Sequence, residues 1–194
     1  MAAEMFAERG YEATTLVQIA DAASIAPSTL FTYYQSKADI VFSAVDEMLR
    51  HARRRIVDRP DGELATDALL AWFAEDIPAI VESYTEALLW GLKTVVGGQP
   101  ELKMERRIRF AMIEDMIAEA YARDLGTSPD AVRPRVMATI ALRADAQACE
   151  MLKKKRRSSE VTLEYRARVE ARVEYVRRAL ENGAALIETL PAPE

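Results

Sequence analysis

The sequence predicts an all-helical protein of about nine helices, with a small N-terminal domain joined to a larger one. Apolar residues recur at helical spacing almost throughout the 194 residues, and no segment alternates cleanly with a period of two. Only 7 Gly and 8 Pro interrupt this pattern, and 50% of the residues are hydrophobic, which is enough for a sizeable core. These observations exclude sheet-rich and low-complexity classes.

Composition also narrows the functional class. No apolar run reaches the roughly 18 residues of a membrane span, and the start lacks the charged and apolar regions of a signal peptide. The single cysteine, Cys149, excludes an internal disulfide framework and fits a reducing cytoplasm. The single histidine, His51, leaves too few ligands for a zinc site and no partner for a nucleophile. The sequence therefore predicts no enzyme, no metal and no cofactor.

The functional interpretation depends on the first 45 residues. A helix over residues 1–9 ends at Gly10, and because the chain starts inside this helix we expect a truncated or mis-assigned start. Thr14 or Thr15 is predicted to cap a second helix. Ser36 is predicted to cap a fourth helix, 36–57, which leads out of this domain.

Between these helices the pattern is that of two crossed helices joined by a tight turn at Ser24. Pro27 supplies a preset backbone angle at the start of the third helix, which runs to about Tyr34. Small and apolar residues fall where the crossed helices must touch, and short polar residues gather at the front of the third helix. This layout is typical of a helix-turn-helix, whose second helix enters the major groove of DNA.

A second, larger domain is predicted beyond the break at residues 59–62. We place the two domains at residues 1–45 and 46–194, joined by the helix 36–57. The further helices predicted are 63–81 with a kink at Pro78, 84–96, 100–125, a helix opened by Ser128-Pro129-Asp130, and a last long helix capped by Ser158 or Ser159.

Seventeen positions of the first 45 residues carry a recognisable spacing. They are Phe6, Gly10, Tyr11, Thr14, Thr15, Ile19, Ala20, Ala23, Ile25, Ser28, Leu30, Phe31, Tyr33, Tyr34, Lys37, Ile40 and Val41. In this spacing the segment resembles the DNA-binding domain of the TetR family of bacterial transcriptional regulators. The rest of the chain matches that family only in architecture, because such regulators carry a helical ligand-binding domain whose last two helices pair in a dimer.

The resemblance implies roles for individual residues in DNA binding. The candidates that face the groove are Gln18, Pro27, Ser28, Thr29, Thr32 and Tyr33. Thr15, Tyr33 and Lys37 are candidates for positioning contacts with phosphate, helped by the amides of helix N-termini. Gln is able to pair with adenine, and Ser or Thr with several bases. The alternative is that Thr15, Ser28 and Ser36 only cap helices, and that Lys37 is only a surface charge.

Charge opposes a nucleic-acid partner. The net charge is −5, and residues 1–58 contain six Lys or Arg against eight Asp or Glu. DNA-binding faces are normally basic because phosphate neutralisation supplies much of the affinity. The chain also departs from the family at Phe31, where Tyr is common, and in lacking a basic arm before the first helix. Ser24 replaces the usual glycine of the turn, which we expect to be tolerated if its backbone avoids the left-handed region.

The middle helices hold apolar side chains that could line a cavity or fill a solid core. The resemblance favours a ligand pocket, whose predicted residues are Trp72, Phe73, Asp76, Trp90, Arg109, Phe110, Met112, Met116, Tyr121 and Arg143. Met and aromatic side chains make adaptable apolar walls, and the few polar groups would orient the polar end of a ligand or pair with each other. This composition suggests a small hydrophobic or amphipathic effector.

The last helix has an apolar seam at alternating spacings of three and four. Its members Val169, Val173, Val176, Leu180 and Ile187 are predicted to form a dimer interface. The basic run 153–157 before this helix is read as a solvated helix end, where cations complement the helix dipole, and not as a nucleic-acid patch.

Together these features predict a ligand-responsive transcriptional repressor that binds a palindromic DNA operator as a homodimer and is released by its effector. Its partners would be double-stranded DNA, a second copy and the effector, with no membrane. The alternative from another class is a helical small-molecule carrier or interaction protein of the same fold that lacks DNA recognition. The acidic charge favours this alternative, and the intact spacing from Thr14 to Lys37 opposes it.

Overall fold

The computed structural model describes residues 1–76, 95–151 and 161–188, and every regular element in these ranges is a helix. This confirms the all-α fold class. None of the described helices is long and apolar enough to cross a membrane. The predicted kink at Pro78, the segment around Trp90, and the basic run 153–157 with the caps at 158–159 lie outside the described residues.

The chain forms two compact units, and they divide it differently from the predicted domains. The first unit combines residues 1–48 with 80–110, and the second combines residues 49–79 with 111–194. The first unit therefore adds the start of the helix near residue 100 to the predicted DNA-binding segment. Each unit is described by itself below.

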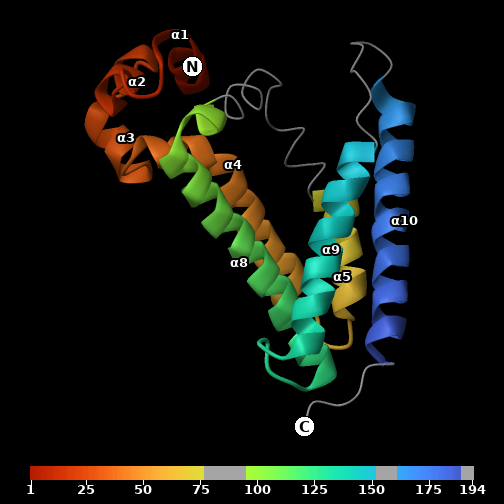
Figure 1. Ribbon diagram of the computed structural model, residues 1–194. Helices are drawn as coiled ribbons and strands as arrows, with labels where there is room; N and C mark the ends of the chain where they lie inside the picture. The colour runs from red at the N-terminus through yellow and green to blue at the C-terminus, as the bar shows by residue number, and fades with distance from the viewer. Residues whose placement is uncertain (77–94, 152–160, 189–194) are drawn as a thin grey trace. The chain divides into compact units, whose positions relative to one another are not determined.

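The first unit begins with three short helices, α1 (Ala2–Arg9), α2 (Leu16–Ala22) and α3 (Pro27–Tyr33), followed by α4 (Lys37–Ala52) (Figure 1). Gly10 ends α1 with a φ of 90°, a conformation that glycine adopts without strain, and its N–H donates to the carbonyl of Phe6. Asp39 accepts the N–H of Ser36, whose hydroxyl accepts the N–H of Asp39 in return. This reciprocal pair starts α4 where the sequence predicts it.

The core of the first unit joins all four of these helices. Its buried residues on α1 to α4 are Met5, Phe6, Ile19, Ala20, Leu30, Val41 and Phe42. Val95, Val96 and Leu102 complete the core, and Leu102 lies on α8 (Pro100–Leu125). The predicted contact between the crossed helices is confirmed at Ile19 and Leu30, which are both buried.

The second unit contains α5 (Ala65–Ala71), the C-terminal part of α8, α9 (Val132–Met151) and α10 (Val161–Glu188). Helices α9 and α10 pack side by side and run in opposite directions (Figure 1). Two short π-helices interrupt the α-helical pattern, η1 (Arg53–Val57) directly after α4 and η2 (Trp72–Asp76) directly after α5. Such π turns are frequent at functional sites.

The start of α9 differs from the prediction. The helix begins at Val132, and the segment Ser128-Pro129-Asp130 forms a separate turn in which the hydroxyl of Ser128 accepts the N–H of Asp130. The serine and proline predicted to start the helix therefore form a turn that precedes it. Pro134 lies in the first turn of α9, where a missing N–H costs nothing.

Candidate nucleic-acid interface

The turn between α2 and α3 has a strained backbone at Ser24. The φ of Ser24 is 56°, in the left-handed region, so the condition under which serine replaces the usual glycine without strain is not met. The N–H of Ser24 donates to Asp21 and the N–H of Ile25 donates to Ala20, which closes α2 with the usual left-handed turn geometry. For a residue other than glycine this conformation costs about 1 kcal/mol. The hydrogen bonds of the turn and the core beneath it hold Ser24 there.

Helix α2 starts with a complete capping box between Thr15 and Gln18. The backbone N–H of Gln18 donates to the Thr15 hydroxyl (3.2 Å), and the backbone N–H of Thr15 donates to the Gln18 side-chain oxygen (2.9 Å). The capping interpretation of Thr15 is therefore confirmed, and Thr14 is buried instead, with its hydroxyl 2.8 Å from the Gly10 carbonyl. The box also occupies the oxygen that Gln18 would need to pair with adenine.

Helix α3 presents the predicted groove residues to solvent. Ser28, Thr29, Thr32 and Tyr33 are exposed, with Tyr33 at 75%, while Pro27 is half-buried. The Thr32 hydroxyl donates to the carbonyl of Ser28 (2.9 Å) and keeps its lone pairs for a donor outside the helix. The structure thus places five of the eight predicted DNA-binding residues together on one short helix.

The Lys37 side chain turns inward and does not lie free on the surface. Its ammonium group donates to the carbonyls of Tyr11 (2.6 Å) and Glu12 (3.3 Å) and lies 4.4 Å from the centre of the Tyr11 ring. The interpretation of Lys37 as a mere surface charge is therefore wrong, because the lysine ties α4 to the turn after α1. A contact with phosphate would require Lys37 to share or release these carbonyls.

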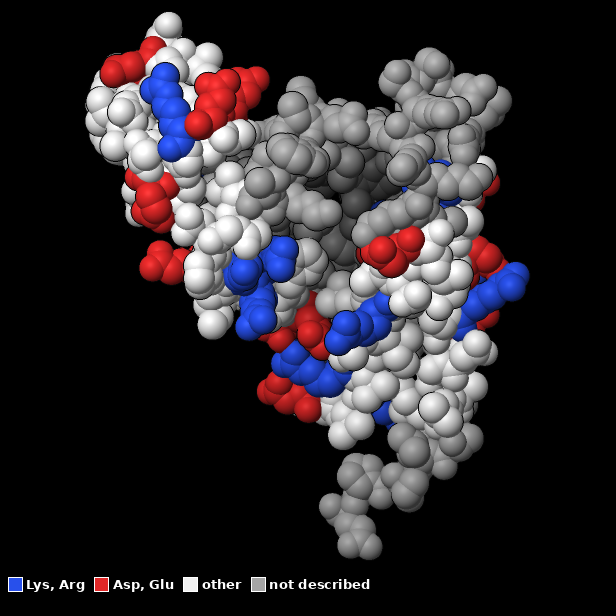
Figure 2. Space-filling model, turned by 45° about the horizontal axis from the view of Figure 1, so that its top comes forward, with Lys and Arg blue, Asp and Glu red and all other residues white. Residues whose placement is uncertain are grey.

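The electrostatics of this region are acidic. Residues 1–48 contain Arg9 and Lys37 as their only Lys or Arg, against seven Asp or Glu. On the face drawn in Figure 2, the N-terminal part of the chain shows acidic clusters beside a small basic patch. Phosphate neutralisation by residues 1–48 is correspondingly small.

The predicted ligand residues fall in both units. In the second unit Trp72, Phe73 and Tyr121 are buried, Met116 is half-buried, and Met112 and Arg143 are exposed. The buried indole N–H of Trp72 has no hydrogen-bond partner among the described residues. The Arg172 guanidinium lies 5.5 Å from the ring of Phe73 and donates to Asp145 (2.5 Å). Trp90 and the side chain of Asp76 lie outside the described residues.

Arg109 and Phe110 belong to the first unit, and there Arg109 has a structural role. Its guanidinium donates to Asp46 on α4 (2.8 Å) and to Glu105 on its own helix (2.6 Å), and it lies 4.4 Å from the centre of the Phe42 ring. Hydrogen bonds to these carboxylates raise the pKa of Arg109, although burial opposes them. Arg109 is therefore paired within the protein, but its partners are Asp46 and Glu105 and not the other predicted polar residues.

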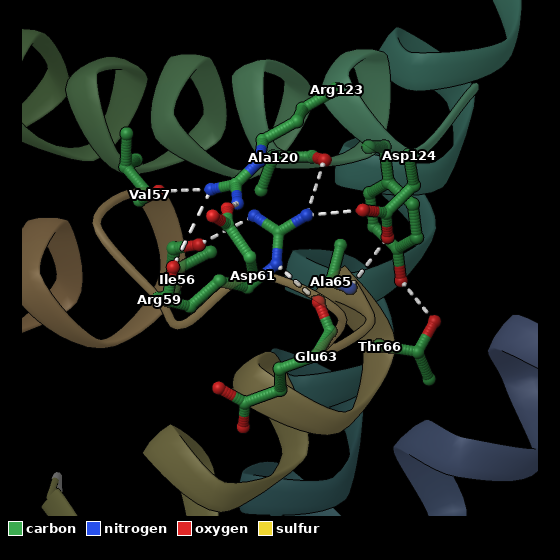
Figure 3. Close-up of polar contacts among 11 residues, drawn as sticks. Ile56, Val57, Arg59, Asp61, Glu63, Ala65, Thr66, Ala120, Arg123 and Asp124 are labelled. Atoms are coloured by element: carbon green, nitrogen blue, oxygen red, sulfur yellow. Dashed lines mark hydrogen bonds and ion pairs between the residues drawn. The ribbon is translucent and has the colours of Figure 1, made fainter. Parts of the chain in front are cut away.

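Sequence reasoning missed a buried arginine in the second unit. Arg59 is 3% exposed and donates to the carbonyls of Glu63 (2.8 Å), Ile56 (2.8 Å) and Ala120 (3.1 Å), and to the carboxylate of Asp124 (Figure 3). Asp124 also accepts the N–H of Ala65 (2.6 Å). This cluster ties the segment after η1 to α8 and to the start of α5. Its only sequence signal is an arginine beside a proline-glycine break, which is indistinguishable from a solvated loop.

The predicted dimer residues on α10 are partly used within the chain. Val176, Leu180 and Ile187 are buried in the second unit at 0%, 1% and 6% exposure, and Val169 and Val173 are half-buried. Within one chain the side chains of Val176, Leu180 and Ile187 are therefore covered, which leaves little of their surface for a second copy. The seam is real, but its partner is the chain's own helices, including α9.

Comparison with known proteins agrees with this description. A family model described as "Bacterial regulatory proteins, tetR family" matches residues 1–44. The HTH-type transcriptional regulator TcmR of Streptomyces glaucescens is 30% identical over 147 residues, which cover 72% of this chain and 64% of that protein. The HTH-type transcriptional repressor KstR2 of Mycobacterium tuberculosis is 34% identical over 123 residues, covering 59% of this chain and 54% of that one. The chain thus spans less than two thirds of both relatives.

A solved structure supports the fold. The TetR family transcriptional regulator PfmR from Thermus thermophilus superposes with a TM-score of 0.52, and the match covers 93% of this chain and 94% of that one at 16% identity. The helix-turn-helix geometry, the matched segment and these relatives agree with one another. Residues 1–44 match the TetR family of bacterial regulatory proteins, and the chain as a whole has the fold of a TetR family regulator.

Proposed function

We propose that this protein is a transcriptional repressor that binds a palindromic DNA operator as a homodimer and releases it when a small hydrophobic or amphipathic effector binds. The observation that carries the proposal is the exposed polar face of α3 on a helix-turn-helix whose other face is buried. An exposed second helix of this kind fits the major groove. The relatives' names as transcriptional regulators and repressors support the same function.

A homodimer follows from the way such a helix reads DNA. A single seven-residue α3 contacts too few base pairs for specificity, whereas two copies read half-sites about one helical turn apart, near 34–36 Å. A palindromic operator mirrors the two-fold symmetry of the dimer. An effector that prefers a dimer with another spacing between the two α3 helices lowers the affinity for DNA.

The second unit offers a donor for the effector at Trp72. The indole N–H of Trp72 has no partner within residues 1–76, 95–151 and 161–188; an unpaired buried N–H costs about 1–3 kcal/mol, and a ligand oxygen that accepts from it would remove that cost. Phe73 lies beside Trp72, with ring centres 5.2 Å apart, and supplies apolar contact area. The effector we propose therefore combines an apolar body with a hydrogen-bond acceptor such as a carbonyl or carboxylate oxygen.

Fluorescence anisotropy with labelled DNA tests the proposal. The full chain should select palindromic sequences from a random duplex pool, and binding should weaken with salt. Thr29→Ala on α3 should weaken binding to a selected sequence several-fold, because it removes a hydroxyl from the groove face. Thr127→Ala is the matched control, since Thr127 is exposed in the loop after α8, and it should bind DNA like the parent.

The second candidate is a small-molecule carrier or interaction protein of this fold without DNA recognition. The two basic residues against seven acidic ones in residues 1–48 favour it. In that case no duplex is enriched from the random pool at any salt concentration, and Thr29→Ala has no binding phenotype. Enrichment of a palindromic duplex would contradict the carrier function.

A further inference from the structure

The α3 surface lacks the side chains that usually read bases through paired hydrogen bonds. Such readout uses Arg or Lys on guanine, Asn or Gln on adenine, and Asp or Glu on cytosine. Helix α3, Pro27–Tyr33, contains only proline, serine, threonine, leucine, phenylalanine and tyrosine. Base recognition by this helix is therefore limited to hydroxyl groups and apolar contacts.

The neighbouring helix does not supply the missing reader. Gln18 is exposed on α2, but its side-chain oxygen accepts the N–H of Thr15 at 2.9 Å. This capping box engages one of the two lone pairs of that oxygen and directs it towards Thr15, so the amide nitrogen is the freer group. A two-bond contact with adenine needs the oxygen as well.

Residues 1–48, which contain the helix-turn-helix, also offer few cations for phosphate contacts. Lys37 already donates to two backbone carbonyls, which leaves Arg9 as the other Lys or Arg of residues 1–48. Charge neutralisation gives affinity without sequence information, and its size appears as the slope of affinity against salt. A reader with so few cations must gain more of its affinity from contacts with the bases.

Phe31 is the fully apolar side chain that α3 exposes, beside the ring of Tyr33 and the methyl groups of Thr29 and Thr32. The residue is 45% exposed, and it lies one turn after Ser28 on the same side of the helix. In the first unit this ring keeps apolar surface in water, which a partner would have to bury. In the major groove the apolar feature of the bases is the thymine C5-methyl group, and phenylalanine is among the side chains that contact it.

We propose that Phe31 is a specificity-determining residue that reads a thymine C5-methyl group in each half-site of the operator. The hydroxyls of Ser28 and Thr29 add contacts beside it, and the complex depends weakly on salt. This inference rests on the proposed function, because it names how the same surface recognises DNA. It goes further by assigning the base, the atom and the side chain.

Replacement of thymine by deoxyuridine tests the inference, since it removes only the methyl group. Palindromic duplexes are first selected by the full chain from a random pool, and each thymine position is then replaced symmetrically in both half-sites. At one position per half-site the affinity should fall about 10- to 20-fold, as expected for two fully buried methyl groups. The slope of log affinity against log salt should correspond to about two to four phosphates for the dimer.

Variants of Phe31 test whether this side chain is the one that contacts the thymine methyl group. Phe31→Ala should bind the thymine duplex about as weakly as the parent binds the deoxyuridine duplex, and it should no longer distinguish the two. Phe31→Tyr retains the ring and should retain the discrimination. Tyr33→Phe is the matched control on the same helix, and it should keep the full deoxyuridine effect.

Three results overturn the inference while leaving the proposed function intact. They are a selected half-site without thymine, equal affinity for thymine and deoxyuridine at every position, and a deoxyuridine effect of unchanged size in Phe31→Ala. Failure to select any duplex overturns the proposed function and this inference together. The two failures are therefore distinguishable.

Discussion

Arg59 is a buried guanidinium whose hydrogen bonds join three segments of the second unit (Figure 3). Arg59→Met keeps an apolar stem but leaves three carbonyls and the carboxylate of Asp124 without this donor. Removing one partner of a buried ion pair costs about 3–5 kcal/mol. We expect a loss of that size in the free energy of unfolding, measured by urea denaturation and circular dichroism.

Arg123→Met is the control for Arg59. Arg123 is an exposed neighbour on α8 that pairs with Asp61 at 2.6 Å, and Asp61 is fully exposed. Exposed pairs contribute about 0–1 kcal/mol, so Arg123→Met should change the free energy of unfolding little. Equal losses in the two variants would contradict the assignment of Arg59 as a structural centre.

Tyr121 carries a pH dependence that belongs to the same unit. Burial raises the pKa of Tyr121 to about 12, and its hydroxyl lies 3.0 Å from that of Thr66. Because the folded pKa lies above the unfolded value near 10, the associated stability is complete below about pH 10 and is lost as the pH rises towards 12. Two pKa units correspond to about 2–3 kcal/mol.

An ultraviolet titration of tyrosinate absorbance measures this shift. In the native protein an ionisation step near pH 12 should appear, and Tyr121→Phe should remove it. Circular dichroism at each pH reports whether the fold persists. A folded protein in which Tyr121→Phe leaves the titration curve unchanged would refute the shift.

At the scale of elements, α9 and α10 approach closely at Gly183. A Cβ atom at Gly183 would lie 2.3 Å from the Cδ1 atom of Ile140, so Ile140 must change rotamer before any larger residue fits. Alanine in place of a helical glycine otherwise gains about 1 kcal/mol. In an Ile140→Val background, which lacks Cδ1, Gly183→Ala should therefore raise the free energy of unfolding by about 1 kcal/mol.

With Ile140 intact the gain from Gly183→Ala should be smaller or reversed. The difference between the two backgrounds is the coupling energy of the contact, expected at about 0.5–3 kcal/mol. Urea denaturation of the four proteins gives this value. If the effects of the two substitutions are strictly additive, α9 and α10 have room for a Cβ atom at residue 183.

Local sequence signals predict the helices of this chain well, but they predict poorly which partners a polar side chain contacts. The caps at Thr15 and Ser36, the C-cap at Gly10 and the proline start of α3 depend on neighbouring residues, so the sequence is sufficient for them. Lys37 and Arg59 depend on carbonyls from other segments, and their roles had no local signal. The left-handed Ser24 shows the same limit, because tertiary packing overrides backbone preference.

The dimer seam illustrates a second limit of sequence reasoning. Alternating spacings of three and four on α10 correctly indicate a helix that packs against another helix. Periodicity does not say whether that partner belongs to the same chain. Burial answers the question for Val176 and Leu180, whose side chains are covered within the second unit.

At the scale of the whole molecule, a homodimer that uses α10 must use its other face. Ala171, Tyr175, Arg178 and Asn182 follow one another every three or four residues and are exposed, with Tyr175 at 40%. Tyr175→Glu places a charge in this stripe and should produce monomers, because an unpaired charge in an interface is costly. Sedimentation velocity measures the change in mass.

Two matched variants separate loss of the dimer from loss of the fold. Tyr175→Phe keeps the apolar ring and should remain dimeric, whereas Val176→Asp should lower the melting temperature because it buries a carboxylate in the second unit. Operator binding should weaken in Tyr175→Glu and not in Tyr175→Phe, since two copies of α3 are needed to read both half-sites. If Tyr175→Glu remains dimeric, the dimer interface lies on elements other than this face of α10. If the parent protein is monomeric and still binds a palindrome tightly, the proposed function does not require a dimer.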